Sequence, residues 1–514
     1  MIQIKINGHE TIVEDGTTIL QAAEVAGFMV PSMCYNEELG HFTSCMLCLV
    51  KDLTNGRLIP SCSVTATEGM SIATEDEEIR EARQTGLELL LSEHVGDCQG
   101  PCQISCPAHM NIPQMNRLIA AGKFEAALKL VKKDIALPAV LGRICPAPCE
   151  GACHRRTVDS SVSICLLKRF VGDENDLHPY PPFPKTGKSV AVIGAGPAGL
   201  AAAYYLQLNG YQTVLFDKES VAGGLLRTNI DPDLLPPSVL DKEINTILST
   251  GVVFKGETEI NAIYFQQIHN EYDAVVVATG ALADEIRNWG FITHPKGIEA
   301  DRNSYETSMK GVFAIGNTLR FSRMSVRPIG QGKEVAWSVS QFLSGEEPQG
   351  EPQLFNSRFG KLIQQEISEY LKESVPYNRI SSDHANLNGY TREEAIQEAR
   401  RCLHCDCRDI DNCKLRDLSG RYKANQSHYG GNERKAITKH FTSSIVYEPL
   451  KCIKCGICVR MTSKYQEEFG FSYIGRGFDV EIGVPFNESV ESGLAKTAEI
   501  VAKACPTGAL SIKD

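Results

Sequence analysis

The sequence predicts a multidomain protein of mixed α/β and α+β class. A glycine-rich turn at residues 194–199 joins an apolar strand to a helix, which is how an α/β nucleotide-binding unit begins. Alternating residues at 2–6 predict a strand of a separate, smaller sheet. The 514 residues suffice for roughly three to five domains, and a hydrophobic content of 42% is typical of globular chains.

Charge and hydropathy argue against two kinds of partner. A net charge of −11 without a cluster of Lys and Arg disfavours nucleic acid binding. The longest apolar run, residues 189–206, is interrupted by glycine and proline, so it predicts strand, turn and helix and no membrane span. Because the N-terminus lacks the charged start and apolar core of a secretory signal, we expect a cytoplasmic protein.

The 19 cysteines are the most informative feature of the composition. With His94 added, they form five sets of four candidate metal ligands, and no cysteine is left over. Thiols this closely spaced in a large chain without a secretory signal favour iron–sulfur or zinc sites over disulfides. The sets are Cys34, Cys45, Cys48, Cys62; His94, Cys98, Cys102, Cys106; Cys145, Cys149, Cys153, Cys165; Cys402, Cys405, Cys407, Cys413; and Cys452, Cys455, Cys458, Cys505.

Residues 1–80 predict a small cluster-binding domain. Short β patterns at 2–6 and 10–13 precede a helical stretch at 18–26 and a loop with the first set of cysteines. Four thiolates on loops suit a 2Fe-2S cluster, with zinc as the alternative. This block resembles the N-terminal ferredoxin-like domain of the large iron–sulfur subunit of complex I and of related hydrogenases and formate dehydrogenases, which implies a β-grasp fold.

The segment after residue 80 extends that resemblance. A helical pattern from Arg83 to Leu91 ends at His94-x3-Cys98, as it does in the complex I subunit. The Pro that follows Cys106 is a further indication of a cluster. As a ligand, the neutral His94 would raise the potential of its cluster, as in Rieske centres. The alternative is an ordinary surface histidine.

Residues 81–180 resemble the N-terminal domain of the glutamate synthase small subunit and of dihydropyrimidine dehydrogenase. The matching segments are 106–113, 142–146, 149–153 and 162–169. In that family, a helical domain holds two 4Fe-4S clusters and exchanges ligands between its two cysteine-rich segments. The resemblance therefore implies one cluster on His94, Cys98, Cys102 and Cys153, and another on Cys106, Cys145, Cys149 and Cys165.

A proline-rich connector at 179–184 precedes the nucleotide-binding motif. The motif Gly194-Ala-Gly196-Pro-Ala-Gly199 lies between a strand at 189–193 and a helix that extends to Leu208. Its glycines permit a tight turn, the close approach of a pyrophosphate and the packing of helix on strand. Asp217 ends the next strand, where it can bind a ribose hydroxyl.

Later segments favour FAD as the nucleotide. A strand at 274–277 leads into Ala278-Thr-Gly280, and the segment 311–316 ends in the pair Gly316-Asn317. This set resembles the FAD domain of the glutamate synthase small subunit and thioredoxin reductase. That family has a Gly-Asp pair at the position where this chain has Gly316-Asn317. The candidate cofactor residues are Gly194, Gly196, Pro197, Ala198, Gly199, Asp217, Lys218, Gly223, Gly224, Leu225, Arg227, Ala278, Thr279, Gly280, Gly316 and Asn317.

The FAD domain, residues 186–347, is expected to lack an NAD(P)H domain. Relatives insert a second nucleotide-binding domain between the two last glycine segments, and here only the residues between Gly280 and Gly316 are available. A single βαβ unit needs about 30 residues, and a dinucleotide domain needs several such units. We therefore expect the flavin to exchange electrons with clusters or with a partner.

Two cysteine sets follow the FAD domain. Residues 348–435 predict a linker and a helix, opened by a capping box at Thr391-x-x-Glu394, that leads to Cys402-x2-Cys405-x-Cys407-x5-Cys413. Either a 4Fe-4S cluster or zinc suits that set. Residues 436–514, with three close cysteines and a remote Cys505-Pro, resemble the ferredoxin-like 4Fe-4S domain of the complex I subunit.

The resemblances imply an electron-transfer flavoprotein. We expect FAD, one 2Fe-2S cluster and three or four 4Fe-4S clusters, with zinc as the alternative at Cys402–Cys413. The chain would serve a soluble oxidoreductase of hydrogenase, formate dehydrogenase or NAD(P)H-linked type, together with a flavin- or NADH-binding subunit or a metal-containing catalytic subunit. The alternatives are a self-sufficient FAD and iron–sulfur reductase of a small substrate, and a scaffold braced by its clusters. No side-chain set stands out as catalytic.

Overall fold

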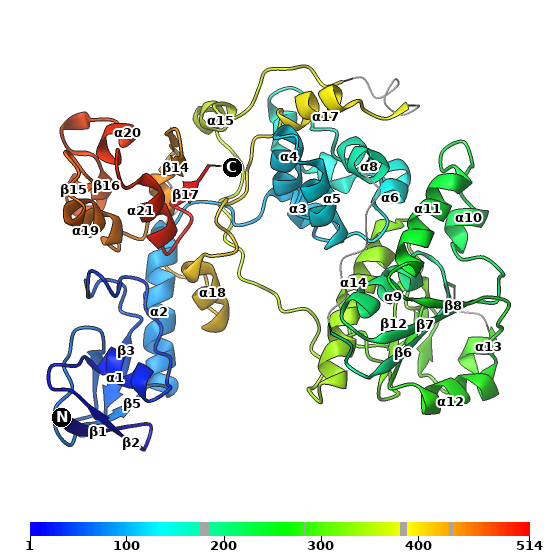
Figure 1. The fold of residues 1–514 in the computed structure, drawn as a ribbon, viewed down its shortest axis with the longest axis horizontal. Helices are drawn as coiled ribbons and strands as arrows, with labels where there is room; N and C mark the ends of the chain where they lie inside the picture. Colours follow the sequence, from blue (N-terminus) through cyan, green and yellow to red (C-terminus); the bar gives the residue numbers. More distant parts are fainter. Residues whose placement is uncertain (175–183, 282–283, 381–387, 431–434, 514) are drawn as a thin grey trace. The chain divides into compact units, whose positions relative to one another are not determined.

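The computed structural model describes residues 1–174, 184–281, 284–380, 388–430 and 435–513 (Figure 1). The chain forms two compact units. Unit 1 contains residues 1–99, 353–373 and 404–514, and unit 2 contains residues 100–352 and 374–403. Most of the proline-rich connector at 179–184 lies outside the described residues.

Unit 1 begins with a five-stranded sheet of order β2-β1-β5-β3-β4. The strands are β1 (Ile2–Ile6), β2 (His9–Val13), β3 (Leu49–Asp52), β4 (Arg57–Pro60) and β5 (Ser71–Ala73). Alternate residues of β1, such as Ile4 and Ile6, are buried, as the alternating pattern predicts. Helix α1 (Ile19–Val25) covers this core and begins with a capping box on Thr18.

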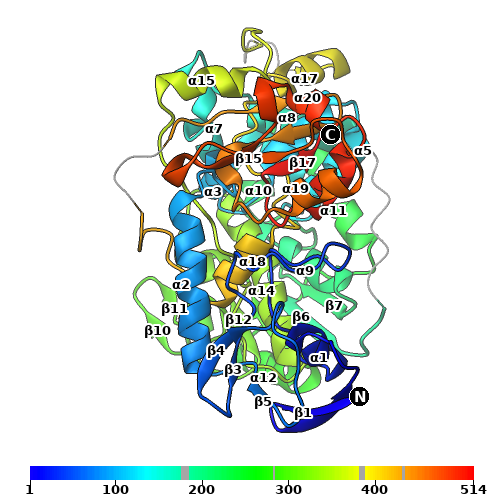
Figure 2. The ribbon, with the colours of Figure 1, turned by 90° about the vertical axis from the view of Figure 1, so that its left-hand side faces the viewer.

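Helix α2 (Glu77–Glu93) leads from this sheet to the C-terminal part of unit 1 (Figures 1 and 2). Asp76 caps its start, and His94 is the first residue after its end. Arg83 is buried on the helix and donates hydrogen bonds to the carbonyls of Leu49 (2.7 Å) and Thr74 (3.0 Å), which tie the helix to the sheet. This helix therefore sets where His94 lies.

The C-terminal part of unit 1 combines a three-stranded sheet, a hairpin and short helices. The sheet has the order β13-β14-β17, and the hairpin pairs β15 with β16. The strands are β13 (His440–Phe441), β14 (Ile445–Tyr447), β15 (Ser472–Ile474), β16 (Glu481–Gly483) and β17 (Leu510–Ile512). The helices are α15 (Gln364–Leu371), α18 (Lys414–Arg421), α19 (Ile457–Lys464), α20 (Val490–Gly493) and α21 (Ala498–Ala504).

Unit 2 contains the predicted helical domain. Its helices are α3 (Pro101–Ser105), α4 (Ile112–Ala120), α5 (Phe124–Lys132), α6 (Pro138–Ile144), α7 (Pro148–Gly151), α8 (Ile164–Glu174) and α17 (Arg392–Ala399). Helices α6 and α8 approach closely because each offers a glycine: a Cβ at Gly142 would lie 2.5 Å from Cβ of Arg169, and one at Gly172 would lie 2.7 Å from the backbone nitrogen of Ala139. The predicted capping box at Thr391 opens α17.

The other part of unit 2 is the predicted Rossmann-like domain. Its parallel sheet has the order β12-β9-β6-β7-β8. The strands are β6 (Ser189–Ile193), β7 (Gln212–Phe216), β8 (Val253–Lys255), β9 (Ala274–Val277) and β12 (Val312–Ala314). The helices are α9 (Pro197–Leu208), α10 (Leu225–Thr228), α11 (Pro237–Leu248), α12 (Ala262–Glu271) and α14 (Val326–Leu343).

The segment between Gly280 and Gly316 forms no second nucleotide-binding fold in the described residues. It contains the short helix α13 (Asp284–Arg287) and a hairpin of β10 (Thr293–His294) and β11 (Gly297–Ile298). The elements of the two units confirm the expected layout of four folds, namely a 2Fe-2S domain, a helical cluster domain, a Rossmann-like domain and a C-terminal ferredoxin-like domain.

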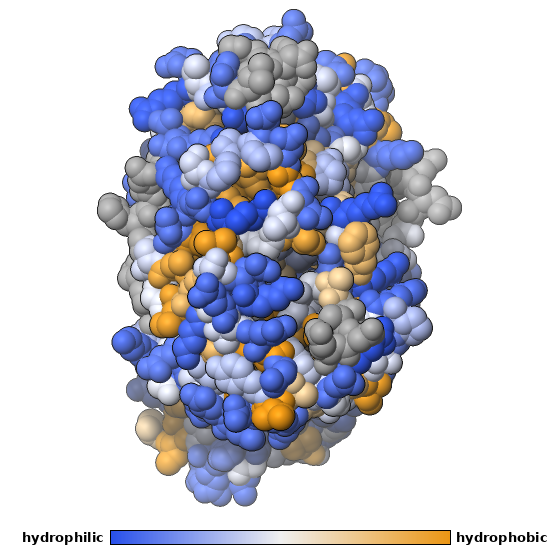
Figure 3. Space-filling model, turned by 90° about the vertical axis from the view of Figure 1, so that its right-hand side faces the viewer, coloured by the Kyte–Doolittle hydropathy of each residue, from blue (hydrophilic) through white to orange (hydrophobic). Residues whose placement is uncertain are grey.

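None of the helices in the described part of the chain has the length and apolar character that a bilayer span requires. On the face shown in Figure 3, apolar side chains form small groups separated by hydrophilic ones.

Candidate functional site

The four cysteines of the N-terminal domain are buried and lie together as free thiols. Cys48 Sγ and Cys62 Sγ are 3.3 Å apart. A hydrogen bond from Cys48 lowers the pKa of Cys62 to about 7, and one from Cys45 lowers the pKa of Cys34 to about 4. The backbone N–H of Ser44 also donates to Cys34 Sγ at 3.4 Å. Hydrogen bonding thus favours the thiolate form, which is the form that ligates iron, at two of the four cysteines.

The four cysteines of the C-terminal domain line one small pocket. Its lining includes Cys452, Cys455, Cys458 and Cys505, and it is otherwise largely apolar. Burial raises the pKa of Cys452 to about 12, although the N–H of Lys454 donates to its sulfur at 3.3 Å. Buried thiolates need a compensating positive charge, which the iron of a cluster supplies.

Arg460 of α19 joins the loops of these two sites. Its guanidinium donates to the carbonyl of Cys34 at 2.9 Å and to those of Leu39, Gly40 and His41 at 3.2 Å each. Phe42 of the same loop stacks on Tyr473 with ring centroids 6.0 Å apart. The sequence motifs did not identify this arginine, because its partners are backbone carbonyls.

Replacement of Arg460 by alanine is expected to loosen this junction. Hydrogen bonds from a charged donor contribute about 1.5–3 kcal/mol each, so the Cys34 loop should lose its position beside α19. We expect a weaker magnetic interaction between the two reduced clusters in electron paramagnetic resonance (EPR) spectra. The exposed Arg476 supplies the control, Arg476→Ala. Unchanged spectra for Arg460→Ala would contradict this role.

Four cysteines of the helical domain surround a buried lysine. Lys168 Nζ lies 3.8 Å from Cys165 Sγ. Burial alone would lower the pKa of Lys168, yet it is raised, because four thiols lie near the ammonium group. These thiols belong to Cys165, Cys145, Cys149 and Cys106. The structure thus brings together one predicted ligand set, and Lys168 is a neighbour that spacing alone did not reveal.

The other predicted cluster ligands are divided between the units. His94 and Cys98 belong to unit 1, whereas Cys102 and Cys153 belong to the core of unit 2. The set Cys402–Cys413 is divided as well, because the boundary between the units falls after Leu403. In the described residues, no three His, Cys, Asp or Glu side chains converge as they would around a single metal ion.

The glycine motif forms a tight cradle at the start of α9. A Cβ at Gly199 would lie 1.8 Å from the carbonyl oxygen of Gly194, and Gly194 itself has φ +106° and no room for a side chain. At Gly196, in contrast, a Cβ would meet no protein atom within 4 Å. This position therefore faces open space beside the helix N-terminus, where a pyrophosphate binds in such motifs.

Asp217 and Asn317 fix the loops around this cradle. Asp217 accepts a hydrogen bond from the N–H of Ala195 at 2.6 Å, and Asn317 accepts one from the N–H of Ser322 at 2.9 Å. Arg227 donates to the carbonyl of Ala222 and pairs with Asp241. The other candidate residues of these loops, namely Pro197, Ala198, Lys218, Gly223, Gly224, Leu225, Ala278, Thr279, Gly280 and Gly316, lie next to the strand ends and helix starts of the same domain.

Helix α14 connects the nucleotide cradle with a cluster loop. Gln331 on this helix accepts a hydrogen bond from the N–H of Gly316 at 2.8 Å. One residue earlier, Gly330 packs on the loop after Cys106, since a Cβ there would lie 2.8 Å from the carbonyl oxygen of Pro107. The loop of Gly316 and the loop of Cys106 thus rest on one rigid element.

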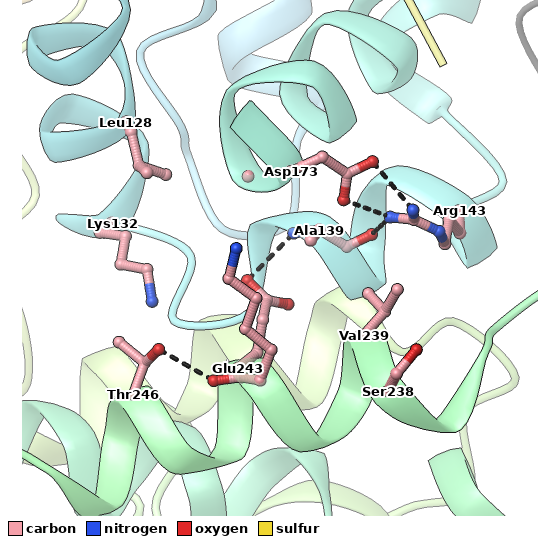
Figure 4. A pocket seen from close by; sticks show the side chains of 11 residues that line it. Leu128, Lys132, Ala139, Arg143, Asp173, Ser238, Val239, Glu243 and Thr246 are labelled. Carbon is pink, nitrogen blue, oxygen red and sulfur yellow. Dashed lines mark hydrogen bonds and ion pairs between the residues drawn. The ribbon is translucent and has the colours of Figure 1, made fainter. Parts of the chain in front are cut away.

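A cavity of about 440 Å³ in unit 2 is separate from these sites (Figure 4). Glu243 of α11 accepts hydrogen bonds from the N–H groups of Ala139 (3.1 Å) and Val140 (2.8 Å) at the start of α6. Arg143 pairs with Asp173 through two bonds of 2.8 Å. These polar groups hold the helices together, and no cysteine lines the cavity.

Four families match successive segments of the chain. They are described as 2Fe-2S iron–sulfur cluster binding domain (residues 1–77), dihydropyrimidine dehydrogenase domain II with a 4Fe-4S cluster (89–178), NAD(P)-binding Rossmann-like domain (192–255), and ferredoxin-like domain of NADH-quinone oxidoreductase subunit 3 (442–511). The chain is thus similar to the iron–sulfur flavoproteins glutamate synthase small subunit and dihydropyrimidine dehydrogenase in its middle part, between domains similar to those of complex I.

Curated relatives are subunits of oxidoreductases. The NADPH-Fe(3+) oxidoreductase subunit beta of Geobacter sulfurreducens is 34% identical over 310 residues, which are 58% of this chain and 44% of the relative. The NADP(+)-dependent formate dehydrogenase subunit beta of Moorella thermoacetica is 37% identical over 35% of this chain and 29% of the relative. The NADPH glutamate synthase small chain of Bacillus subtilis is 36% identical over 36% of this chain and 41% of the relative. The chain spans less than half the length of these relatives.

Proposed function

We propose that this chain is the electron-transfer subunit of a larger oxidoreductase and links a flavin to a series of iron–sulfur clusters. The arrangement on α14 supports this most directly. One face of the helix holds the loop of Gly316 in the nucleotide cradle, and Gly330 packs on the loop of Cys106. The described residues between Gly280 and Gly316 form no second nucleotide-binding fold, whereas α14 contacts both the cradle and the loop of the candidate ligand Cys106.

The donor sets suit the proposed cofactors. Buried free cysteines on loops, with backbone N–H groups directed at their sulfurs, fit one 2Fe-2S cluster on Cys34, Cys45, Cys48 and Cys62. Three or four 4Fe-4S clusters would use the remaining sets, with zinc as the alternative at Cys402–Cys413. FAD, when bound, supplies the conversion between two-electron and one-electron chemistry.

The protein's own groups position and tune these sites. The helix start at Pro197 presents backbone N–H groups to a pyrophosphate, and the open face at Gly196 lets it approach. Lys168 places a positive charge among four thiols, which favours the more negative, reduced form of a cluster there. Arg460 keeps two ligand loops adjacent. These groups would hold the cofactors and their ligand loops in place.

The partner is proposed to be a nucleotide-, hydrogen- or formate-oxidising subunit in the cytoplasm, where cysteines stay reduced. Two relatives, from Geobacter sulfurreducens and Moorella thermoacetica, are named as beta subunits, which supports a multi-subunit setting. The similarity to a glutamate synthase small chain supports a second candidate, a self-sufficient reductase of a small substrate.

Reduction of the bound flavin separates the two candidates. In anaerobic stopped-flow experiments on the isolated chain, we expect NADH or NADPH to bleach the flavin at least about a hundredfold more slowly than dithionite, a difference of about 2.7 kcal/mol in the barrier. The physical reason is that the described residues between Gly280 and Gly316 form no fold that would bring a nicotinamide to the flavin. Rapid bleaching by NADH or NADPH alone would contradict the proposal and favour the second candidate.

A further inference from the structure

The cavity between α5, α6, α8 and α11 holds charged side chains that none of the proposed cofactor sites uses (Figure 4). Its volume of about 440 Å³ falls within the range of roughly 300–1,000 Å³ that is typical of small-molecule sites. All of its lining residues belong to unit 2, and they include neither a cysteine nor a residue of the nucleotide cradle. An occupant would therefore be a molecule other than the proposed redox cofactors.

Two buried side chains of opposite charge line this cavity. Lys132 on α5 and Glu243 on α11 have exposed fractions of only 3% and 5%. Figure 4 shows the lysine side chain extending from α5 toward α11. In the part of the chain that the structure describes, no ion pair joins the two groups, although each charge acts on the pKa of the other. The two charges thus face the same cavity without direct contact.

Lys132 has fewer partners than its charge requires. Two backbone N–H groups of α6 donate to the carboxylate of Glu243. The ammonium group of Lys132, which has three N–H donors, makes one hydrogen bond of 3.2 Å to the carbonyl of Ala136 and lies 5.5 Å from the centre of the Tyr204 ring. Burial lowers the pKa of this lysine, because the charged form loses its hydration. An anionic acceptor in the cavity would stabilise it.

The other walls of the cavity suit a small organic anion. Three cationic and two anionic side chains line it. Arg143 and Asp173 are already paired with each other through two bonds of 2.8 Å, and the exposed Lys242 adds a further positive charge. Leu128 and Val239 supply apolar surface. A short apolar chain that ends in one negative charge fits both parts of this lining.

We propose that this cavity is a binding site for a small organic carboxylate, whose charged end pairs with Lys132. The site goes beyond the proposed electron-transfer function and does not depend on it. Helix α6 forms one wall and ends at Cys145, and Glu243 holds the start of the same helix. The occupant would thus adjoin the helix that positions a candidate cluster ligand, which is a place suited to an effector.

The test is isothermal titration calorimetry on the full chain, prepared anaerobically, with sodium butyrate as the probe. We expect butyrate to bind at millimolar concentration. Lys132→Met should weaken this binding at least tenfold, because it removes the charge that the carboxylate needs. The matched control is Lys129→Met, an exposed lysine of the same helix that pairs with Glu125, and its affinity should be unchanged. Equal affinities for butyrate in the native chain and Lys132→Met, or no binding to the native chain, would overturn the inference.

A second variant keeps the test decisive where Lys132→Met does not fold. Ser238 is exposed and lines the cavity, so Ser238→Trp obstructs the space without removing a buried charge. We expect this variant to lose butyrate binding and to keep its denaturation midpoint and flavin content. Butyrate binding that persists in Ser238→Trp would show that the probe binds elsewhere. Tighter binding of butylamine or of inorganic phosphate than of butyrate would also overturn the inference, since neither is a carboxylate.

Discussion

The Gly196→Ala variant is expected to fold normally and to lose most of its flavin. The added methyl group meets no protein atom within 4 Å, so it creates no strain in the protein itself. It would stand where the pyrophosphate must approach the backbone at the start of α9. We expect the dissociation constant for FAD to rise at least tenfold, which corresponds to about 1.4 kcal/mol or more. Flavin content after gel filtration and titration of the apoprotein with FAD provide the measurement.

Two further glycine variants serve as controls. Gly199→Ala places a Cβ 1.8 Å from the carbonyl of Gly194, so it should lower both the stability and the flavin content. Gly86→Ala lies in helix α2 with ordinary contacts of 3.6 Å or more and should leave both unchanged. Stoichiometric FAD with unchanged affinity in Gly196→Ala would show that the cradle is not the flavin site.

The Arg401→Leu variant is expected to destabilise unit 2 by about 3–5 kcal/mol, because it leaves a buried carboxylate without its cation. Arg401 and Glu398 are both completely buried, with 2.7 Å between Nη1 and Oε1. Glu398 also accepts the N–H of Ser163 at 2.8 Å, and Arg401 donates to the carbonyl of Ser160 at 2.8 Å. The network thus ties the segment before Cys402 to the loop after α7, and its loss should lower the denaturation midpoint.

The neighbouring Arg400 supplies a matched control. It is exposed on the same helix end, so Arg400→Leu should change the stability by no more than about 0.5 kcal/mol. Urea denaturation, followed by circular dichroism of the anaerobic protein, compares the two variants. Equal midpoints would mean that the buried pair contributes nothing to the stability of unit 2.

The sequence predicted the four folds correctly, whereas its grouping of the ligands stays a prediction. Strands 2–6 and 189–193 have the predicted bounds, because alternating and continuous apolar patterns depend on local burial. The capping box at Thr391 also has its predicted place. Each of these features depends on a few neighbouring residues, so local sequence patterns are sufficient to predict it.

Which cysteines lie together depends on contacts that are distant in the sequence. The spacing of Cys98 and Cys102 suggests a shared site, yet the structure places them in different units and brings Cys407 to Cys98. Lys168 and Arg460 were missed for a related reason: a lysine in a helix and an arginine that binds carbonyls have no recognisable motif. Only packing shows that such residues adjoin a cysteine site.

The division of unit 1 into three segments has a consequence for biosynthesis. Residues 1–99 leave the ribosome well before residues 404–514, which share a second core cluster with Met33, Leu47 and Leu87. At about 5–20 residues per second, the N-terminal segment waits roughly 15–60 s for its partner strands and helices. During that interval its nascent surface stays uncovered, so chaperones and the enzymes that deliver iron and sulfide have a defined window in which to act.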